Sequence, residues 1–348
     1  MNKLIEFKAA VLRRLNEPVQ IHSVSTPALV TGQVLVKILY AGICHSQLME
    51  IQGKRGEDRY LPHMLGHEGV GEVIKVGHGV TRFKLGDRVI IGWMKSTGID
   101  AGGCIYQSNI GPINGGPTTT FSEYSVISEN RLVLKPSNLN DAVSVLLGCA
   151  LLTGAGMVLN QLKPTEGSTV LVFGLGGIGL SALLALHNFK TKNIVAIDIE
   201  PEKLTLAKEL GATNTYLSTK EGISHFRKDF PLGVDFAIES AGLCSTIEQA
   251  FDLLSKNGLC IFASHPTTGD KISIDPHQMI QGKRLQGTWG GASFPERDIP
   301  LIADIIADNK LPIDKLISRY YKLDEINTAL DDLNKRKIVR ALIDMTVS

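Results

Sequence analysis

Apolar residues follow two different patterns in the two parts of this chain. In the first 150 residues, short apolar runs stand between glycine-containing turns, at 34–40, 69–76 and 88–91. Short strands spaced in this way predict a compact β-barrel. From about residue 151, helical and strand patterns alternate, which predicts an α/β domain built on a doubly wound parallel sheet.

The stretch from 168 to 198 has the pattern strand, glycine-rich turn, helix and strand. Its turn contains Gly174, Gly176, Gly177, Ile178 and Gly179, and a helix starts there. In a dinucleotide fingerprint the first glycine makes a tight turn, the second admits a pyrophosphate, and the last lets the helix pack on the strand. The free N–H groups at the start of the helix would face that pyrophosphate. The pattern therefore predicts a dinucleotide site.

Asp198 ends the second strand of this unit, 19 positions after Gly179 (198 − 179). A carboxylate at this place accepts hydrogen bonds from the adenosine ribose and repels a 2′-phosphate. It predicts NAD rather than NADP.

A membrane span is the alternative interpretation of residues 170–186, which are nearly free of polar side chains. A spanning helix needs about 20 apolar residues. This run is shorter and has four glycines near its start, which disfavours a span.

The end of the chain predicts a helix over 296–308, a helix over 324–334 and a strand over 339–343. We expect this tail to return to the first domain. Residues 1–150 and 289–348 would then form one domain, and 151–288 the dinucleotide-binding domain. The cleft between two domains is the default ligand site.

The composition is that of a globular protein whose positive and negative charges nearly balance. The 348 residues carry 36 basic and 35 acidic side chains, and 43% are hydrophobic. This balance argues against nucleic acid as a partner. Charges near the N-terminus interrupt the apolar core that a signal peptide needs, so we expect a cytoplasmic protein with free cysteines rather than disulfides.

Candidate metal ligands occur in three separate places. His67 and Glu68 stand between glycines, and Cys44 and Cys149 add two thiols. Two thiolates and an imidazole, with a fourth position left for water or substrate, form a known type of catalytic zinc site. By spacing alone, cysteines acting as small buried hydrophobic residues remain an equal alternative.

Motifs along nearly the whole chain resemble the zinc-dependent alcohol dehydrogenases of the medium-chain dehydrogenase/reductase superfamily. The resemblance is carried by 42–45 (Gly-Ile-Cys-His), 66–69 (Gly-His-Glu-Gly), 86–89, 148–149, the fingerprint at 174–179, 290–291 and Arg340. It implies a GroES-like β-barrel catalytic domain beside a Rossmann domain that binds NAD.

The resemblance also implies a role for individual residues. Cys44, His67 and Cys149 would be the zinc ligands, and Glu68 an outer group or transient ligand. Ser46 would hydrogen-bond the substrate oxygen and begin a proton path. Thr153 and Ile178 would touch the nicotinamide, Lys203 the adenosine ribose, and Arg340 the pyrophosphate. Trp93 and Met49 would line the substrate pocket, as would His265, for which an ordinary loop histidine is the equal alternative.

Three departures from the family pattern change the expectation. The stretch 96–116 has only Cys104 where relatives cluster four cysteines, and one thiol cannot build a tetrahedral site, so we expect one zinc per subunit. Gln47 replaces an aspartate that orients the ligand histidine, and it can still accept a hydrogen bond. Met49 replaces a relay histidine, which leaves bulk water or His45 for the last proton step. The charged stretch 54–59 is interpreted as a solvated loop rather than as an anion contact.

The expected reaction is reversible oxidation of an alcohol, with zinc acting on the substrate oxygen and hydride passing to NAD. A polyol or sugar-derivative dehydrogenase shares this core, and Cys149 weighs mildly against it. A glutathione-linked formaldehyde dehydrogenase is disfavoured by the shortened 96–116 region. A zinc-free nucleotide-binding relative would lack the ligand set. The family further implies a homodimer or homotetramer.

Overall fold

The computed structural model describes residues 4–263 and 265–347. These residues divide into two compact units, one made of residues 4–149, 294–300 and 313–347, the other of residues 150–293 and 301–312. The division falls within helix α9 (Pro295–Asp308). It differs from the expected boundaries because 289–293 and 301–312 group with the second unit. Ser293 Oγ donates to Leu152 O at 2.8 Å, which ties that turn to the second unit.

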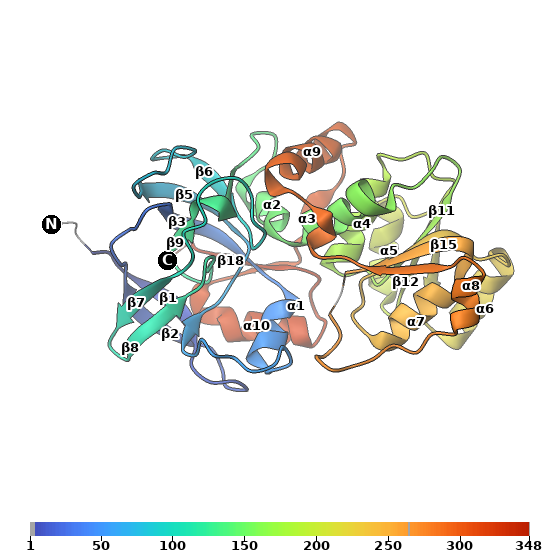
Figure 1. Ribbon diagram of the computed structural model, residues 1–348, viewed down its shortest axis with the longest axis horizontal. Helices are drawn as coiled ribbons and strands as arrows, with labels where there is room; N and C mark the ends of the chain where they lie inside the picture. Colours follow the sequence, from blue (N-terminus) through green and yellow to red (C-terminus); the bar gives the residue numbers. More distant parts are fainter. Residues whose placement is uncertain (1–3, 264, 348) are drawn as a thin grey trace. The chain divides into compact units, whose positions relative to one another are not determined.

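The first unit combines a closed barrel with a second sheet. The barrel consists of β1 (Glu6–Leu12), β2 (Gln20–Ser25), β7 (Cys104–Ser108), β8 (Gly111–Gly115) and β4 (His63–Met64). The second sheet has the order β10 (Leu132–Leu134), β6 (Arg88–Ile91), β5 (Gly69–Val76), β3 (Gln33–Ile43), β18 (Ala341–Asp344) and β17 (Arg319–Tyr321), and β9 (Tyr124–Ser128) pairs with β3. Helices α1 (His45–Ile51), α2 (Asp141–Val145) and α10 (Ile326–Asn334) belong to this unit. The predicted barrel is confirmed (Figure 1).

The end of the chain completes the second sheet of this unit. Strand β18 pairs antiparallel with β3, with Ala341 opposite Ile43. The tail therefore returns to the first unit, and the register carries Arg340 to the end of β3, beside Cys44. Apolar side chains of β3, including Val36 and Ile38, share one core with Ile326 of α10.

A buried carboxylate orders the loops around residues 81, 82 and 99. Glu129 is 2% exposed and accepts backbone N–H bonds from Thr81, Arg82 and Ile99, at 3.2, 3.3 and 2.8 Å. Each such bond satisfies a backbone donor that would otherwise be unpaired. Cys104 begins β7 outside this group, and burial raises its pKa to about 11.

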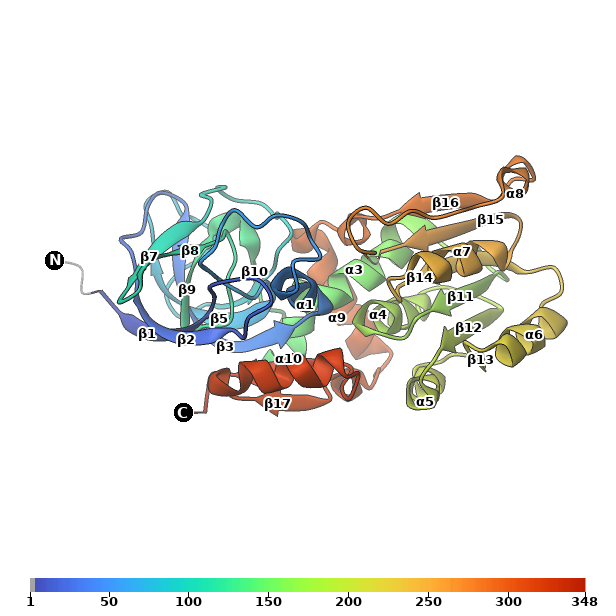
Figure 2. The same ribbon diagram turned by 90° about the horizontal axis from the view of Figure 1, so that it is seen from below.

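The second unit is a six-stranded sheet in which every pair of neighbouring strands is parallel. Its order is β13 (Asn214–Leu217), β12 (Asn193–Asp198), β11 (Thr169–Phe173), β14 (Val234–Glu239), β15 (Leu254–Phe262) and β16 (Arg284–Gly287). Figure 2 shows the strands in this order. Its helices are α3 (Ala150–Gly156), α4 (Gly177–Leu186), α5 (Pro201–Glu209), α6 (Lys220–Asp229), α7 (Cys244–Asp252) and α8 (Pro276–Ile280), and a π-helix over Met157–Leu162 extends α3.

Both faces of this sheet are covered. Leu171 and Phe173 of β11 pack with Phe226 of α6 and Phe251 of α7 on one face. Because side chains alternate along a strand, Val172 lies on the opposite face, where it is also fully buried. The doubly wound arrangement predicted from the alternating pattern is confirmed, and residues 170–186 form a strand and a helix rather than a membrane span.

Candidate metal centre and nucleotide site

Cys44 and His67 are brought together by the pairing of β3 with β5. Ala41 lies opposite Gly69 in the ladder, and one more backbone bond, from Gly42 N to Glu68 O at 3.1 Å, continues it past the end of the strand. Cys44 follows at the turn into α1. A Cβ on Gly42 would lie 2.7 Å from the Glu68 carboxylate, so a glycine is needed there to let Glu68 pack on the strand.

Cys149 reaches the same place from a different part of the chain. It follows a 3₁₀ turn, and a Cβ on the preceding Gly148 would lie 2.3 Å from the Ile91 carbonyl oxygen and 3.0 Å from Glu68 Cβ. Only a glycine permits this approach. The sequence motif 148–149 therefore has a steric reason: the small residue lets the thiol beside it enter the site.

The side chains so assembled fit a zinc ion. Ligand atoms of Cys44, His67, Glu68 and Cys149 all lie within 4.8 Å of one another, and His67 Nε2 lies 3.3 Å from Cys149 Sγ. Nitrogen and sulfur bound tetrahedrally to one zinc lie roughly 3.6 Å apart, so this pair lies within a few tenths of an ångström of the distance that zinc binding needs.

The protonation of these ligands is strongly coupled. A hydrogen bond from the Cys149 thiol lowers the pKa of Cys44 well below its usual range. The same contact, with burial, raises the pKa of Cys149 well above its usual range. Burial opposes protonation of His67, but the contact with Cys44 and the charges of Cys44 and Glu68 outweigh burial and raise the pKa of His67. One thiolate is thus already favoured, whereas the second thiol and the imidazole hold protons that a cation would displace.

Arg340 and Glu68 form a buried ion pair behind the ligands. Arg340 Nη1 lies 3.2 Å from Glu68 Oε1, and Nη2 lies 3.4 Å from Oε2, while Nη1 also donates to Ile43 O at 3.0 Å. Glu68 is fully buried and Arg340 is 5% exposed. The guanidinium therefore lies next to the metal ligands; its predicted contact with the pyrophosphate stays a prediction.

Gln47 does not accept a hydrogen bond from the ligand histidine, contrary to expectation. Its Oε1 accepts the Cys44 N–H at 2.8 Å, so Nε2 is the atom that faces His67 Nδ1, in a short contact. An amide nitrogen can only donate. Gln47 therefore positions the imidazole while favouring a proton on Nε2, the nitrogen that points toward Cys149.

Ser46 carries a polar atom that the protein itself leaves unused. Its hydroxyl oxygen is buried and has no hydrogen-bond partner among the described residues. A buried unpaired hydroxyl costs about 1–3 kcal/mol, so this position, two residues after Cys44, suits a group supplied by a ligand. His45, the first residue of α1, is exposed, and Met49 is half-buried one turn later.

Each glycine of the glycine-rich turn has its own structural role, and together these roles match those of a nucleotide-binding turn. Gly174 has a φ of +89°, and a Cβ there would lie 2.6 Å from Ala241 N. A Cβ on Gly179 would lie 1.9 Å from the Gly174 carbonyl oxygen, whereas one on Gly176 would meet nothing within 4 Å. The first and third glycines are thus required by the fold, while the open space at Gly176, the N-cap of α4, is left for the pyrophosphate.

Asp198 supports this turn directly. One carboxylate oxygen accepts the Leu175 N–H at 2.6 Å and the other accepts the Glu200 N–H at 2.9 Å. The side chain is only 6% exposed, and each oxygen retains a lone pair for a ribose hydroxyl. Lys203 follows in the first turn of α5 and is half-buried.

Thr153 and Ile178 come from neighbouring helices of the second unit. A Cβ on Gly154 would lie 2.1 Å from Ile178 O, so α3 and α4 are in backbone contact where these residues lie. His265 is exposed, and its ring meets the edge of Trp289, with centroids 5.9 Å apart at 81°. Trp93 in the first unit is half-buried after β6, next to Gly92, whose Cβ would lie 3.0 Å from Gly148 O.

The charged stretch 54–59 is only partly the solvated loop that we expected. Arg59 and Glu57 are exposed and paired with each other at 3.2 Å. Asp58 instead turns inward to His63, a residue that the sequence analysis did not single out. The sequence offered one signal for this contact: His63 follows the charged stretch closely and lies four residues before His67.

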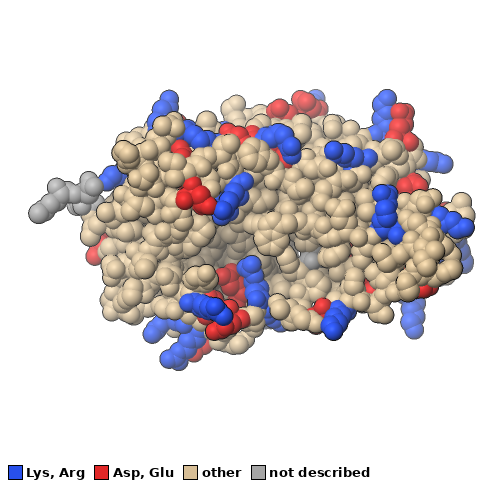
Figure 3. Space-filling view, viewed as in Figure 1, with Lys and Arg blue, Asp and Glu red and all other residues tan. Residues whose placement is uncertain are grey.

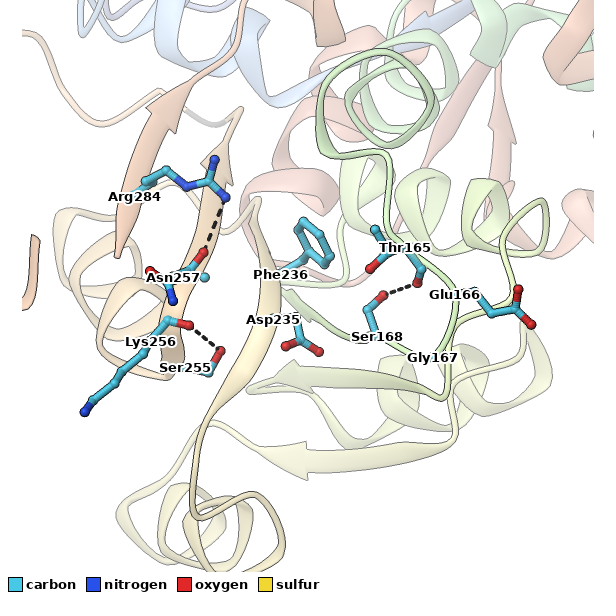
Figure 4. Close-up of a pocket in the computed structure, with 11 residues that line it drawn as sticks. Thr165, Glu166, Gly167, Ser168, Asp235, Phe236, Ser255, Lys256, Asn257 and Arg284 are labelled. Carbon is cyan, nitrogen blue, oxygen red and sulfur yellow. Dashed lines mark hydrogen bonds between the residues drawn. The ribbon is translucent and has the colours of Figure 1, made fainter. Parts of the chain in front are cut away.

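A cavity of about 390 Å³ lies at the other end of the parallel sheet from the glycine-rich turn. Figure 4 shows its lining at the starts of β11, β14 and β16, with Ser168, Asp235 and Arg284 among the side chains. Nucleotides bind at the carboxyl ends of such strands. This hollow is therefore separate from the predicted nucleotide site.

Charge and hydropathy of the described residues add two observations. On the face drawn in Figure 3, basic and acidic side chains are interspersed rather than gathered by sign. No single helix in residues 4–263 and 265–347 is long and apolar enough to cross a membrane, although the bent pair Asp141–Gly148 and Ala150–Leu162 passes that test of length and composition together.

Comparison with known proteins agrees with this geometry. Residues 30–137 match the family described as "Alcohol dehydrogenase GroES-like domain", and residues 177–307 match "Zinc-binding dehydrogenase". The chain is 32% identical to alcohol dehydrogenase class-3 of Caenorhabditis elegans, with 98% of this chain and 97% of the relative covered. It is 30% identical to S-(hydroxymethyl)glutathione dehydrogenase of Synechocystis sp., covering 97% and 99%.

The fold gives the same result. The crystal structure of benzyl alcohol dehydrogenase from Acinetobacter calcoaceticus matches with a TM-score of 0.88 at 28% identity, over 98% of this chain and 99% of that chain. Polyol and zinc-free interpretations are not favoured by these relatives. With both family models matched, relatives aligned end to end and a Cys/His/Cys cluster in place, the chain belongs to the zinc-dependent alcohol dehydrogenases of the medium-chain dehydrogenase/reductase superfamily.

Proposed function

We propose that this alcohol oxidoreductase uses NAD and one thiolate-bound catalytic zinc per subunit, held by Cys44, His67 and Cys149. The observation that carries the proposal is the convergence of these three side chains within 4.8 Å of one another. When bound, the zinc ion supplies Lewis-acid polarisation of the substrate oxygen, and the nicotinamide takes the hydride.

The residues of the chain supply the remaining steps. The unpaired Ser46 hydroxyl accepts a hydrogen bond from the substrate hydroxyl and passes its proton outward. Glu68, paired with Arg340, keeps a buried negative charge behind the ligands. His45 is exposed and is suited to hand the proton to water.

Substitution of one thiol tests the zinc role. Cys44→Ala should remove zinc and abolish alcohol-dependent NAD reduction, because two protein ligands hold the ion far more weakly than three. Cys104→Ala is the matched control, since this cysteine lies outside the ligand group, and it should keep both zinc and turnover. Turnover by Cys44→Ala at wild-type rate would contradict the proposal.

Preference for NAD rests on Asp198. Its carboxylate is fixed by two backbone N–H bonds at the end of β12, where it would repel a 2′-phosphate. We expect kcat/KM for NAD to exceed that for NADP by more than about tenfold, equivalent to about 1.4 kcal/mol. Equal values for the two cofactors would contradict this part of the proposal.

The substrate class is tested with a panel. Two relatives are named for an alcohol and for S-(hydroxymethyl)glutathione, so the panel contains simple and aromatic alcohols, polyols, and formaldehyde with glutathione. We propose that the substrate is a simple alcohol, because the 96–116 stretch is short and provides few residues to line a site for a large adduct. Turnover of the glutathione adduct alone would overturn this choice.

We further propose a homodimer or homotetramer that works in a reducing compartment such as the cytoplasm. Strand β16 pairs only with β15 among the described residues, and an unpaired edge is a ready site for strand addition. The two ligand thiols must stay reduced to bind metal. Sedimentation analysis would test the assembly, and a monomer at micromolar concentration would contradict it.

A further inference from the structure

We propose that Glu50, Asp58 and His63 form a second cation site, which takes a divalent transition metal such as Zn²⁺ through one nitrogen and two carboxylate oxygens. Their ligand atoms lie within 4.8 Å of one another. The group is distinct from the thiolate centre, because it shares no residue with it and contains no sulfur.

The imidazole of His63 has its orientation fixed. His63 is 7% exposed, and its Nδ1 lies 2.9 Å from the Met64 carbonyl oxygen. A carbonyl oxygen only accepts, so Nδ1 carries the proton. Nε2 lies 2.9 Å from Asp58 Oδ2, which also only accepts, so Nε2 carries a proton as well until a metal displaces it. With that proton gone, Nε2 can bind the metal while Nδ1 keeps its bond to the backbone carbonyl, as in other metal-binding histidines.

The Nε2 atom faces two carboxylates. Nε2 lies 2.9 Å from Asp58 Oδ2 and 3.8 Å from Glu50 Oε1. Atoms bound tetrahedrally to one zinc through oxygen and nitrogen lie roughly 3.3–3.6 Å apart, and the two measured distances bracket this range. The two carboxylates require a positive charge at this place, which a proton on Nε2 or a metal ion that displaces it supplies.

The surrounding charges leave room for a cation. Arg55 Nη1 lies 3.6 Å from Glu50 Oε2, whereas His63 lies nearer the other oxygen, Oε1, and the Arg55 side chain is 55% exposed. Asp58 Oδ1 accepts the Tyr60 N–H at 2.9 Å. Two carboxylates and one guanidinium have a net charge of −1, which a divalent cation that displaces the Nε2 proton would offset. The side chains of Glu50, Asp58 and His63 are 9–28% exposed.

The donor set decides the kind of metal. An imidazole nitrogen favours zinc, copper, nickel and cobalt over calcium and magnesium, which prefer oxygen alone. Three protein ligands leave one tetrahedral position for water. A cation here would link the end of α1 to β4. Cys44 directly precedes α1, and His67 follows shortly after β4.

Cobalt titration of the full chain distinguishes the two sites. Thiolates bound to Co²⁺ give charge-transfer absorption in the near ultraviolet, whereas a site of nitrogen and oxygen ligands gives none. With free Co²⁺ buffered by a chelator, we expect two equivalents per chain, of which only one produces that absorption. One equivalent bound without that absorption would count against the thiolate centre but would support this second site.

Substitutions then locate the second equivalent. Asp58→Asn and His63→Gln should each weaken it at least about tenfold, while the thiolate absorption, which also reports a folded centre, is retained. Glu57→Gln is the matched control, because it removes the same charge from the same loop but from an exposed side chain. Glu50→Gln replaces either variant if the absorption is lost.

Two results would overturn the proposal. Saturation of the wild-type chain at one equivalent, with full thiolate absorption, would show that a proton on Nε2 occupies the place of the cation. A second equivalent bound equally well by wild type, Asp58→Asn, His63→Gln and Glu50→Gln would place the metal elsewhere on the chain.

Discussion

At the scale of single residues, Gln47 is the position where this chain can be improved as a zinc binder. Its amide oxygen is occupied by the Cys44 N–H, so its nitrogen donates to His67. In Gln47→Glu both oxygens can accept, which would keep the proton on Nδ1 and leave Nε2 free for the metal. We expect zinc affinity to rise by about 10–100-fold in competition with a chromogenic chelator.

The control for this variant is Gln107→Glu, which adds the same charge at an exposed position of β7. Its zinc affinity should equal that of the wild type. Unchanged or weaker binding by Gln47→Glu would show that the orientation of the amide does not limit the affinity.

Zinc affinity should also rise with pH. The pKa values of Cys149 and His67 are both raised, so their protons persist at neutral pH and compete with the metal, whereas Cys44, with its lowered pKa, releases none. Each displaced proton contributes about tenfold per pH unit. Chelator competition from about pH 6 to about pH 8 should therefore show an increase of roughly 100-fold for one displaced proton and roughly 10⁴-fold for two, and a flat profile would contradict the assigned protonation states.

At the scale of elements, the turn between β11 and α4 uses different glycines for folding and for cofactor binding. Gly176 has an ordinary extended φ of −77° and open space for a Cβ, whereas a Cβ on Gly179 would overlap the Gly174 carbonyl oxygen. Gly176→Ala should thus melt within a few degrees of wild type but bind NADH at least about tenfold more weakly, since its methyl occupies the pyrophosphate position.

Gly179→Ala is the informative counterpart. Because α4 must move away from β11, this variant should lose about 1–3 kcal/mol of unfolding free energy, measured by urea denaturation. Wild-type NADH affinity in Gly176→Ala, determined by fluorescence titration, would contradict the assignment of that space to the pyrophosphate.

At the scale of the whole molecule, the two units should respond differently to loss of zinc. The three ligands come from widely separated parts of the first unit, whereas the glycine-rich turn belongs to the second. A ligand present at 100 times its Kd stabilises the folded state by about 2.7 kcal/mol, which corresponds to roughly 5–10 °C in Tm. Chelation should lower the melting temperature of the first unit by this amount while NADH binding is retained.

Differential scanning calorimetry with and without chelator, followed by NADH titration, makes this measurement. Re-addition of zinc is the control and should restore the transition. Loss of NADH binding together with the metal would show that the two sites are coupled.

Much of this arrangement was predictable because it depends on local patterns. The turn 174–179 and strands 69–76 and 88–91 appear where the sequence predicts them, since buried strands bounded by glycines leave few alternatives. The donor role of Gln47 was not predictable, because it depends on which neighbour occupies the amide oxygen. The inward turn of Asp58 was missed for a similar reason: its partner, His63, is identified only in space.

By itself, the sequence determined the two kinds of domain, the dinucleotide fingerprint and, through motifs spread along the chain, the family. The domains and the fingerprint rest on hydrophobic periodicity and on glycines at fixed offsets, which act over short stretches of chain, whereas the three candidate zinc ligands were implied by the resemblance to the family. Only the tertiary structure decided that Arg340 pairs with Glu68, that Ser46 is left unpaired and that Glu50, Asp58 and His63 converge. Each of these depends on strand register and burial, and so on contacts between residues far apart in the sequence.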